Sequence, residues 1–171
     1  MNGTLGEMVA DACRGRTAFL GVGSVDREDD GAGVRCAEHL ARAGIGNVFI
    51  GAATPERCVP SIRDGGFDSV VLLDAVDTGA EPGSVVMCDA QEIEHRFPAV
   101  STHKLPLSLL ARLLSDGNGS RVNLIGIEAG SVIENRSEMT QRVRETVESL
   151  AGCIEDRMLS NSSVVQEQLC R

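Results

Sequence analysis

The sequence contains neither tryptophan nor tyrosine, and only four phenylalanines, among its 171 residues. The aromatic platforms on which unpaired nucleic-acid bases stack are therefore missing. Basic residues form no cluster able to neutralise a phosphate backbone, and the formal net charge is −9. Both absences argue against nucleic acid as a partner.

Long apolar runs are also missing. No segment approaches the length of a membrane span, and residues 1–16 lack the apolar core of a signal peptide. The six cysteines include no C-x-x-C pair, which argues against a zinc or iron–sulfur site built from neighbouring thiols. Cys36 falls on the apolar stripe of an expected helix and is interpreted as a buried thiol. We expect a cytoplasmic monomer with no membrane partner.

What the sequence does contain is an alternation of apolar runs and amphipathic segments, with a hydrophobic content of 42%. The expected strands are Thr17–Val22, Asn47–Ala52, Ser69–Val76, Ser84–Cys88 and Arg121–Ile127. The expected helices are Asp30–Ala43, Glu56–Asp64, Pro106–Leu114 and Met139 to about Met158.

This order predicts an α/β fold, a three-layer α/β/α sandwich around a mostly parallel twisted sheet of about five strands. Val70–Leu73 has no polar alternation, which is typical of a central strand buried on both faces. Ser84–Cys88 follows too soon for a helical crossover, so one antiparallel edge strand is expected. We expect a single domain over residues 1–159, with residues 1–15 as an N-terminal extension able to form a capping helix, and residues 160–171 as a disordered tail.

The most informative segment is the glycine-rich turn of residues 21–33, between the first strand and the first long helix. A dinucleotide fingerprint needs a third glycine where this chain has Asp26. Three further acids follow, Glu28, Asp29 and Asp30, and they would repel a phosphate. Carboxylates at such a turn offer hard oxygen ligands, so the turn is interpreted as a cation site on a Rossmann-like frame.

Two aspartates are candidates for that site. Asp30 has a structural alternative, because an acid at the start of a helix caps it and interacts favourably with the helix dipole, although Asp29 could take that role instead. Asp74 ends the apolar run of a buried strand, where an uncompensated carboxylate is costly, and this favours a functional role.

The chain has three histidines, and His39 and His95 lie in polar surroundings where we expect them to be solvated. His103 lies in a loop that opens a leucine-rich helix. With Asp30 and Asp74 it would form a histidine-plus-carboxylate set suited to a divalent transition metal with open positions.

The run Asp77-Thr78-Gly79-Ala80 matches the D-T-G-A signature of aspartic proteases. That mechanism needs two carboxylates sharing a proton, and only one copy is present. We interpret the match as a coincidence at a turn. No G-x-S-x-G elbow and no H-E-x-x-H helix is present either.

Taken in order, these motifs resemble the NiFe-hydrogenase maturation endopeptidases over about Ala18 to Ile154. The family pattern opens with a strand and G-N/S-x4-D-D/E-x-x-G, continues with an apolar strand ending in D-A, and ends with a histidine before a leucine-rich helix. The matching runs are Gly23-Ser24, Asp29-Asp30-Gly31-Ala32-Gly33, Leu72-Leu73-Asp74-Ala75 and Thr102-His103-Lys104-Leu105-Pro106-Leu107. A further run that resembles the family is Leu124-Ile125-Gly126-Ile127-Glu128.

The resemblance implies that Asp30, Asp74 and His103 are the catalytic residues and metal ligands. It implies an endopeptidase that removes the C-terminal extension of a NiFe-hydrogenase large-subunit precursor after nickel insertion. The nickel would belong to the substrate, and other divalent ions could occupy the site. Two departures weaken the inference about which substrate is chosen: Ser24 stands where the family often has Asn, and Gly51-Ala52-Ala53 stands where it often has D-G-G.

Two points stay open at this stage. The sequence does not choose between nickel that activates a water and a carboxylate that acts as the base. Two other functions are also compatible with the motifs, a non-catalytic nickel-binding maturation chaperone and a small-molecule Rossmann-like enzyme.

Overall fold

The computed structural model describes residues 4–97, 105–116 and 119–169 of the chain. Its centre is a five-stranded sheet in the order β2-β1-β3-β5-β4, in which β4 alone runs antiparallel to its neighbour. The strands are β1 (Thr17–Val22), β2 (Val48–Ala52), β3 (Ser69–Val76), β4 (Val85–Asp89) and β5 (Arg121–Glu128). The predicted α/β fold with an antiparallel edge strand is confirmed.

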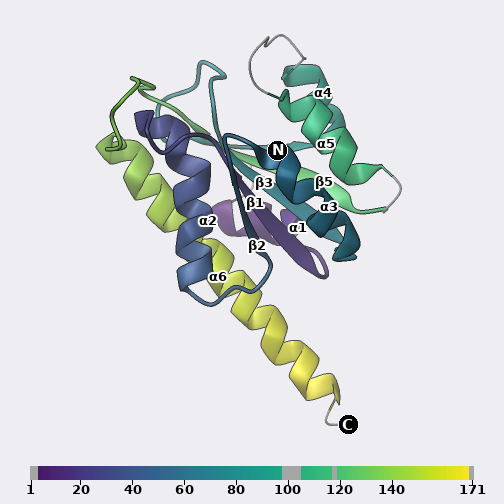
Figure 1. Ribbon diagram of the computed structural model, residues 1–171. Helices are drawn as coiled ribbons and strands as arrows, with labels where there is room; N and C mark the ends of the chain where they lie inside the picture. The colour runs from purple at the N-terminus through teal and green to yellow at the C-terminus, as the bar shows by residue number, and fades with distance from the viewer. Residues whose placement is uncertain (1–3, 98–104, 117–118, 170–171) are drawn as a thin grey trace.

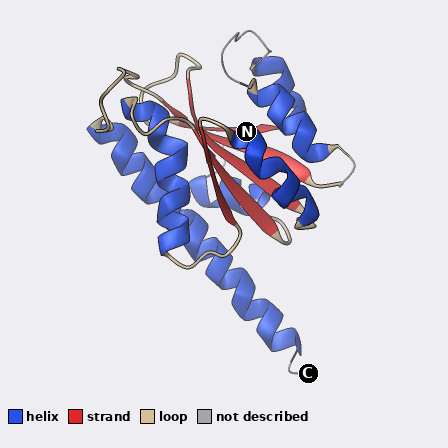
Figure 2. Cartoon of the chain, in the orientation of Figure 1, coloured by secondary structure: helices blue, strands red, loops and turns tan. Residues whose placement is uncertain are grey.

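Helices cover both faces of the sheet (Figures 1 and 2). Helices α1, α2 and α6 pack on one face, and α3, α4 and α5 on the other. The α-helices are α1 (Leu5–Ala12), α2 (Ala32–Arg42), α3 (Val59–Asp64), α4 (Ala90–Arg96), α5 (Leu107–Ser115) and α6 (Gln141–Leu169), and two short 3-10 turns, η1 (Glu28–Gly31) and η2 (Pro55–Cys58), precede α2 and α3. The helix expected over Glu56–Asp64 is thus divided between η2 and α3.

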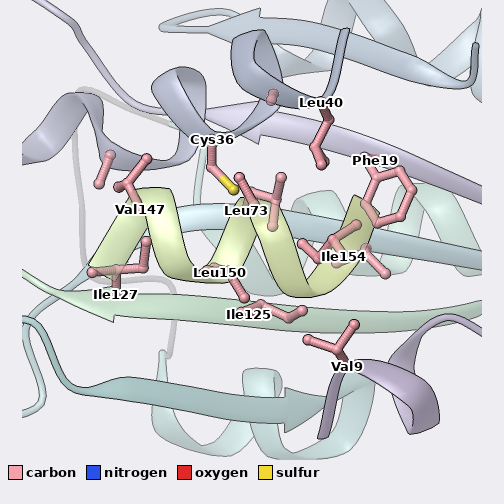
Figure 3. Packing of buried hydrophobic residues seen from close by; sticks show 14 of the residues in the cluster. Val9, Phe19, Cys36, Leu40, Leu73, Ile125, Ile127, Val147, Leu150 and Ile154 are labelled. Atoms are coloured by element: carbon pink, nitrogen blue, oxygen red, sulfur yellow. The ribbon is translucent and has the colours of Figure 1, made fainter. Parts of the chain in front are cut away.

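The continuous apolar run of β3 is explained by burial on both faces. Successive side chains of a strand point to opposite sides, so Val71 and Leu73 join the core under α2 and α6, while Val70 and Leu72 join the core under α3 and α5. Figure 3 shows the first of these cores, where Leu73 lies among side chains of β1, β5, α2 and α6. Cys36 is buried there as predicted, and burial raises the pKa of its thiol to about 12.

One glycine fixes how closely α2 approaches the sheet. A Cβ at Gly33 would lie 2.0 Å from the carbonyl oxygen of Leu73 and 2.7 Å from that of Val22. Only a residue without a side chain therefore allows the first turn of α2 to lie against the ends of β1 and β3. This contact brings the turn that carries Asp30 next to the strand that carries Asp74.

Helix α4 was not predicted, because residues 90–96 read as a solvated charged run. Asp89 caps this helix by accepting hydrogen bonds from Gln91 N and Glu92 N, both at 2.9 Å, and Glu92 Oε2 accepts a bond from Asp89 N at 3.2 Å. This reciprocal capping box and the burial of Ile93 stabilise a short helix in spite of its charge. His95 is exposed, as expected.

Helix α6 is longer than predicted. We expected a disordered tail from residue 160, but the helical backbone continues to Leu169 and extends away from the sheet (Figure 1). Extending a helix that is already formed costs much less free energy than starting one, so the packed turns support the residues beyond them. None of the helices in the described part of the chain is long and apolar enough to cross a membrane.

Deleting residues 160–171 is expected to change the melting temperature by less than about 2 °C. Among the α6 side chains whose burial is described, which run to Ser160, the last fully buried one is Ile154, and residues 160–171 carry no periodic apolar face. Differential scanning fluorimetry measures the shift. As a control, Ile154→Ala should lose about 2–5 kcal/mol of stability, because it leaves a cavity in the core. A fall on truncation as large as that of the control would show that the terminal segment docks on the domain.

Candidate functional site

A cavity of about 210 Å³ opens where three neighbouring parallel strands end. Val22 and Gly23 follow β1, Ala52 and Ala53 follow β2, and Asp74 comes from β3. The strand order places β2 on one side of β1 and β3 on the other, so the chain changes direction across the sheet here. Ligands of open α/β sheets bind at the carboxyl ends of strands near such a switch point.

Asp74 forms one wall of the cavity. Its side chain projects from the buried strand β3, and the residue is only 9% exposed. Its Oδ1 accepts a hydrogen bond from Ala75 N at 2.9 Å. A carboxylate in this position is held in one orientation by the backbone that follows it.

Asp30 forms a second wall, from the 3-10 turn η1. Its Oδ2 accepts a hydrogen bond from Ser24 N at 3.0 Å and lies 3.9 Å from Arg27 Nη1. The N-terminus of α2 is at Gly31 and receives no side-chain capping bond within the described chain, so the helix-capping interpretation of Asp30 and of Asp29 is wrong.

Gly23 lies between these two aspartates. A Cβ there would meet the backbone oxygen of Asp30 at 1.8 Å and Oδ1 of Asp74 at 3.5 Å. Its φ of +114° is also one that L-residues rarely adopt. The first glycine turn of the motif is therefore required for the approach of the two acidic residues, and not for the approach of a phosphate.

The four acids of the turn do not act together as a cation site. Asp26 is exposed, while Asp29 is fully buried and accepts four hydrogen bonds from across the chain. The donors are Gly130 N at 2.8 Å, Ser131 N at 3.0 Å, Thr140 N at 2.7 Å and Thr140 Oγ1 at 2.9 Å. Asp29 thus ties η1 to the segment of residues 129–140, which we call the anchored loop.

Glu28 makes a second tie to the anchored loop. Its carboxylate accepts hydrogen bonds from the Ser131 hydroxyl and Ile133 N and lies 3.5 Å from Arg136 Nη1. The Ser131 bond, then the Ile133 bond and the Arg136 charge, hold the pKa of Glu28 below its usual value, although burial opposes them. Glu28 has a φ of +47°, an unfavourable conformation for a residue with a side chain, and these contacts offset its cost.

The D-T-G-A run is a structural turn in this protein. Glu128, at the end of β5, is 2% exposed and accepts bonds from Thr78 N, Thr78 Oγ1 and Gly79 N at 2.7–3.0 Å. Asp77 is exposed and is not among the described residues that line the cavity. The interpretation of this match as a coincidence is consistent with that arrangement.

The third predicted site residue, His103, lies outside the described residues. Residues close after it in the chain do line the cavity, since Leu105, Pro106 and Leu107 belong to the same lining as Asp30 and Asp74. In the described part of the chain, no three His, Cys, Asp or Glu side chains are grouped closely enough to hold a metal ion. The two carboxylates are the donors that the described site offers, and oxygen donors suit hard and borderline divalent cations. The ligand role of all three residues stays a prediction.

Sequence reasoning did not find three residues that shape this site. Glu28 and Asp29 were read as part of a cation cluster, because contacts with residues a hundred positions away leave no local signal. Arg27 was not singled out at all, although it is the cation closest in sequence to Asp30 and lies beside it.

Comparison with known proteins gives one consistent result. A family model described as hydrogenase maturation protease (HycI) matches residues 34–157, which include Asp74 and His103 and begin just after Asp30. The Hydrogenase 3 maturation protease of Escherichia coli K12 is 33% identical over 134 residues, covering 77% of this chain and 84% of that protein.

Solved structures agree in fold as well. The NiFe hydrogenase maturation protease HycI from Thermococcus kodakarensis KOD1 superposes with a TM-score of 0.78 at 31% identity, covering 87% of this chain and 97% of that one. The endopeptidase HycI from Escherichia coli superposes with a TM-score of 0.70 at 31% identity, covering 82% and 90%. The chain therefore belongs to the hydrogenase maturation protease family and is a peptidase.

Proposed function

We propose that this peptidase removes the C-terminal extension of a NiFe-hydrogenase large-subunit precursor after nickel has been inserted. In this proposal Asp30, Asp74 and His103 engage the nickel carried by the substrate. The observation that carries it is the cavity at the ends of β1, β2 and β3, which is lined by Asp30 and Asp74 and also by residues 105–107, close after His103 in the chain.

The chemistry of the cavity supports hydrolysis without a protein nucleophile. None of the described residues that line it is a serine, threonine, cysteine or lysine. A water molecule is then the natural nucleophile. It would be activated either by the substrate's nickel, which also polarises the scissile carbonyl, or by one of the two carboxylates acting as general base.

An incomplete ligand set favours nickel that arrives with the substrate. Two carboxylates and one imidazole leave coordination positions for ligands from a partner. Asp30 and Asp74 are also held in place by backbone donors, Ser24 N and Ala75 N, before any ion arrives. Such an arrangement is suited to testing whether the precursor already carries its metal.

Family membership favours this function over a nickel chaperone and over a small-molecule Rossmann-like enzyme. The proposal includes a cytoplasmic location and a monomeric enzyme. The five described cysteines are all free, which is typical of a reducing compartment.

A nickel-loaded precursor should be cleaved and the nickel-free precursor left intact. The reason is that the site completes its coordination only with the substrate's own ligands. Mass spectrometry of the large subunit after incubation with the purified protein measures the loss of the extension. A chaperone would leave the length of the loaded precursor unchanged. Efficient cleavage of a nickel-free precursor by protein pre-loaded with zinc would contradict the role of substrate nickel.

Asp30→Asn, Asp74→Asn and His103→Ala should each lower the rate of processing by more than about 100-fold, since each removes a proposed ligand. Asp77→Asn is the matched control. It changes a neighbouring aspartate in the same charge-neutralising way, and we expect processing within about threefold of the wild type. Circular dichroism and melting temperature check that each variant is folded. If Asp77→Asn were as inactive as Asp74→Asn, the aspartic-protease mechanism would have to be reconsidered.

A further inference from the structure

Arg27 lies at the edge of the candidate site with its guanidinium between two carboxylates. Its Nη1 is 3.9 Å from Asp30 Oδ2, and its Nε is 3.9 Å from Glu134 Oε1 on the anchored loop. Both separations are too long for hydrogen bonds. The Nε atom is buried and has no hydrogen-bond partner among the described residues. The side chain is thus attracted by two charges without being locked to either.

The backbone around Arg27 is hydrogen-bonded on both sides, so a change in the position of the guanidinium is assigned to the side chain. Arg27 N donates to Ser24 O at 3.2 Å, and its neighbours pair with Arg136 of the anchored loop. The bonds are Glu28 N to Arg136 O at 2.6 Å and Arg136 N to Asp26 O at 3.1 Å. Glu134 is carried by the same loop and is 75% exposed, whereas Asp30 is 19% exposed.

A cation that binds Asp30 must meet the positive charge of Arg27. A free aqueous ion has to lose water and overcome this repulsion, and coordination by the site's own ligands is the only interaction that offsets these costs. An ion held in a precursor brings several ligands with it, and its binding is supported by the rest of the protein–protein contact. The repulsion costs both ions a similar free energy, but only the substrate-borne ion has protein–protein contacts that offset this cost, so the free ion is left with weak binding.

We propose that Arg27 is a specificity-determining residue, a resident countercharge that pairs with Asp30 in the free enzyme and keeps free divalent cations out of the site. When the substrate's nickel reaches Asp30, the guanidinium shifts toward Glu134, which receives it at the surface. This inference rests on the proposed function, since it assigns Asp30 to the nickel. It adds a residue that selects between two sources of the same metal.

Isothermal titration of the purified full-length chain with Ni²⁺ alone tests this directly. Arg27→Met keeps the aliphatic stem and removes the charge, and its Kd for Ni²⁺ should fall by about fivefold to tenfold relative to the wild type. Arg27→Lys keeps the charge and should stay within about twofold of the wild type. The gain in Arg27→Met should disappear when Asp74→Asn is added, because the extra binding belongs to the cavity.

Arg35→Met is the matched control. Arg35 is 39% exposed and pairs with Glu38 on α2, so its removal changes the net charge equally without touching Asp30. We expect no more than about a twofold change in the Kd for Ni²⁺ at 0.15 M salt, where distant surface charges are screened. An equal gain in Arg27→Met and Arg35→Met would reduce the effect to net charge and overturn the proposal.

A double-mutant cycle tests the shift toward Glu134. In the wild-type background, Glu134→Gln should weaken Ni²⁺ binding by about threefold, because the guanidinium then has no second carboxylate. In the Arg27→Met background the same change should have a smaller effect. Equal effects in both backgrounds would mean that Glu134 acts on the ion independently of Arg27. That result would contradict the proposed movement of the guanidinium toward Glu134.

The outcomes separate this inference from the proposed function. If Arg27→Met binds Ni²⁺ no tighter than wild type while Asp30→Asn still abolishes cleavage of the loaded precursor, the countercharge role fails and the peptidase mechanism stands. If Asp30→Asn leaves both Ni²⁺ binding and cleavage unchanged, the proposed function fails first. Melting curves of Arg27→Met and Arg27→Lys confirm that each comparison uses folded protein.

Discussion

The buried carboxylate of Asp29 is the contact on which the arrangement of the site depends. It accepts four hydrogen bonds from the anchored loop, three of them from backbone N–H groups. Charge-assisted bonds of this kind are about twice as strong as neutral ones, and in a dry environment they are costly to break. They join the first glycine turn to a segment that comes a hundred residues later, just before α6. These hydrogen bonds therefore fix the position of the turn η1, which carries Asp30 to the cavity.

Three consecutive acids of η1 have different roles in the folded protein. Glu28 and Asp29 turn toward the anchored loop, and Asp30 turns toward the cavity. The left-handed backbone at Glu28 and the 3-10 turn that follows make this division possible, since consecutive side chains are sent in different directions. The result is one carboxylate on the wall of the cavity beside two that are hydrogen-bonded to the anchored loop.

The other side of the cavity depends on close packing of the backbone. Gly33 allows α2 to rest on the carbonyl of Leu73, and Gly23 allows the loop after β1 to pass between Asp30 and Asp74. Gly23 stands where a dinucleotide-binding protein also has glycine, whereas Gly33 lies seven residues beyond the position of the missing third glycine. What differs is the charge around the turn, where acids replace the features that hold a pyrophosphate. The same frame thus presents the carboxylates of Asp30 and Asp74 at its cavity, with Arg27 beside Asp30.

Local pattern was sufficient for most of the fold. The apolar runs of β1, β3 and β5, the stripe of α2 and the short link before β4 are all visible along the chain, because burial on one or two faces dictates residue type with a fixed period. Helix α4 was missed since its stability comes from the Asp89–Glu92 capping box and one buried side chain, Ile93, rather than from a periodic stripe.

The sequence alone also shows that carboxylates stand near the ends of two strands, Asp30 after β1 and Asp74 in β3. The residue type at a position can be read without knowing which residues it contacts in the folded protein. Only the tertiary structure decided what each acid does. Asp29 and Glu128 are buried and committed to N–H and hydroxyl donors far away in the chain, and Asp30 lies beside Arg27 and the cavity. Nothing in the local sequence separates Asp29 from Asp30, since the two differ only in the direction that the folded backbone gives their side chains.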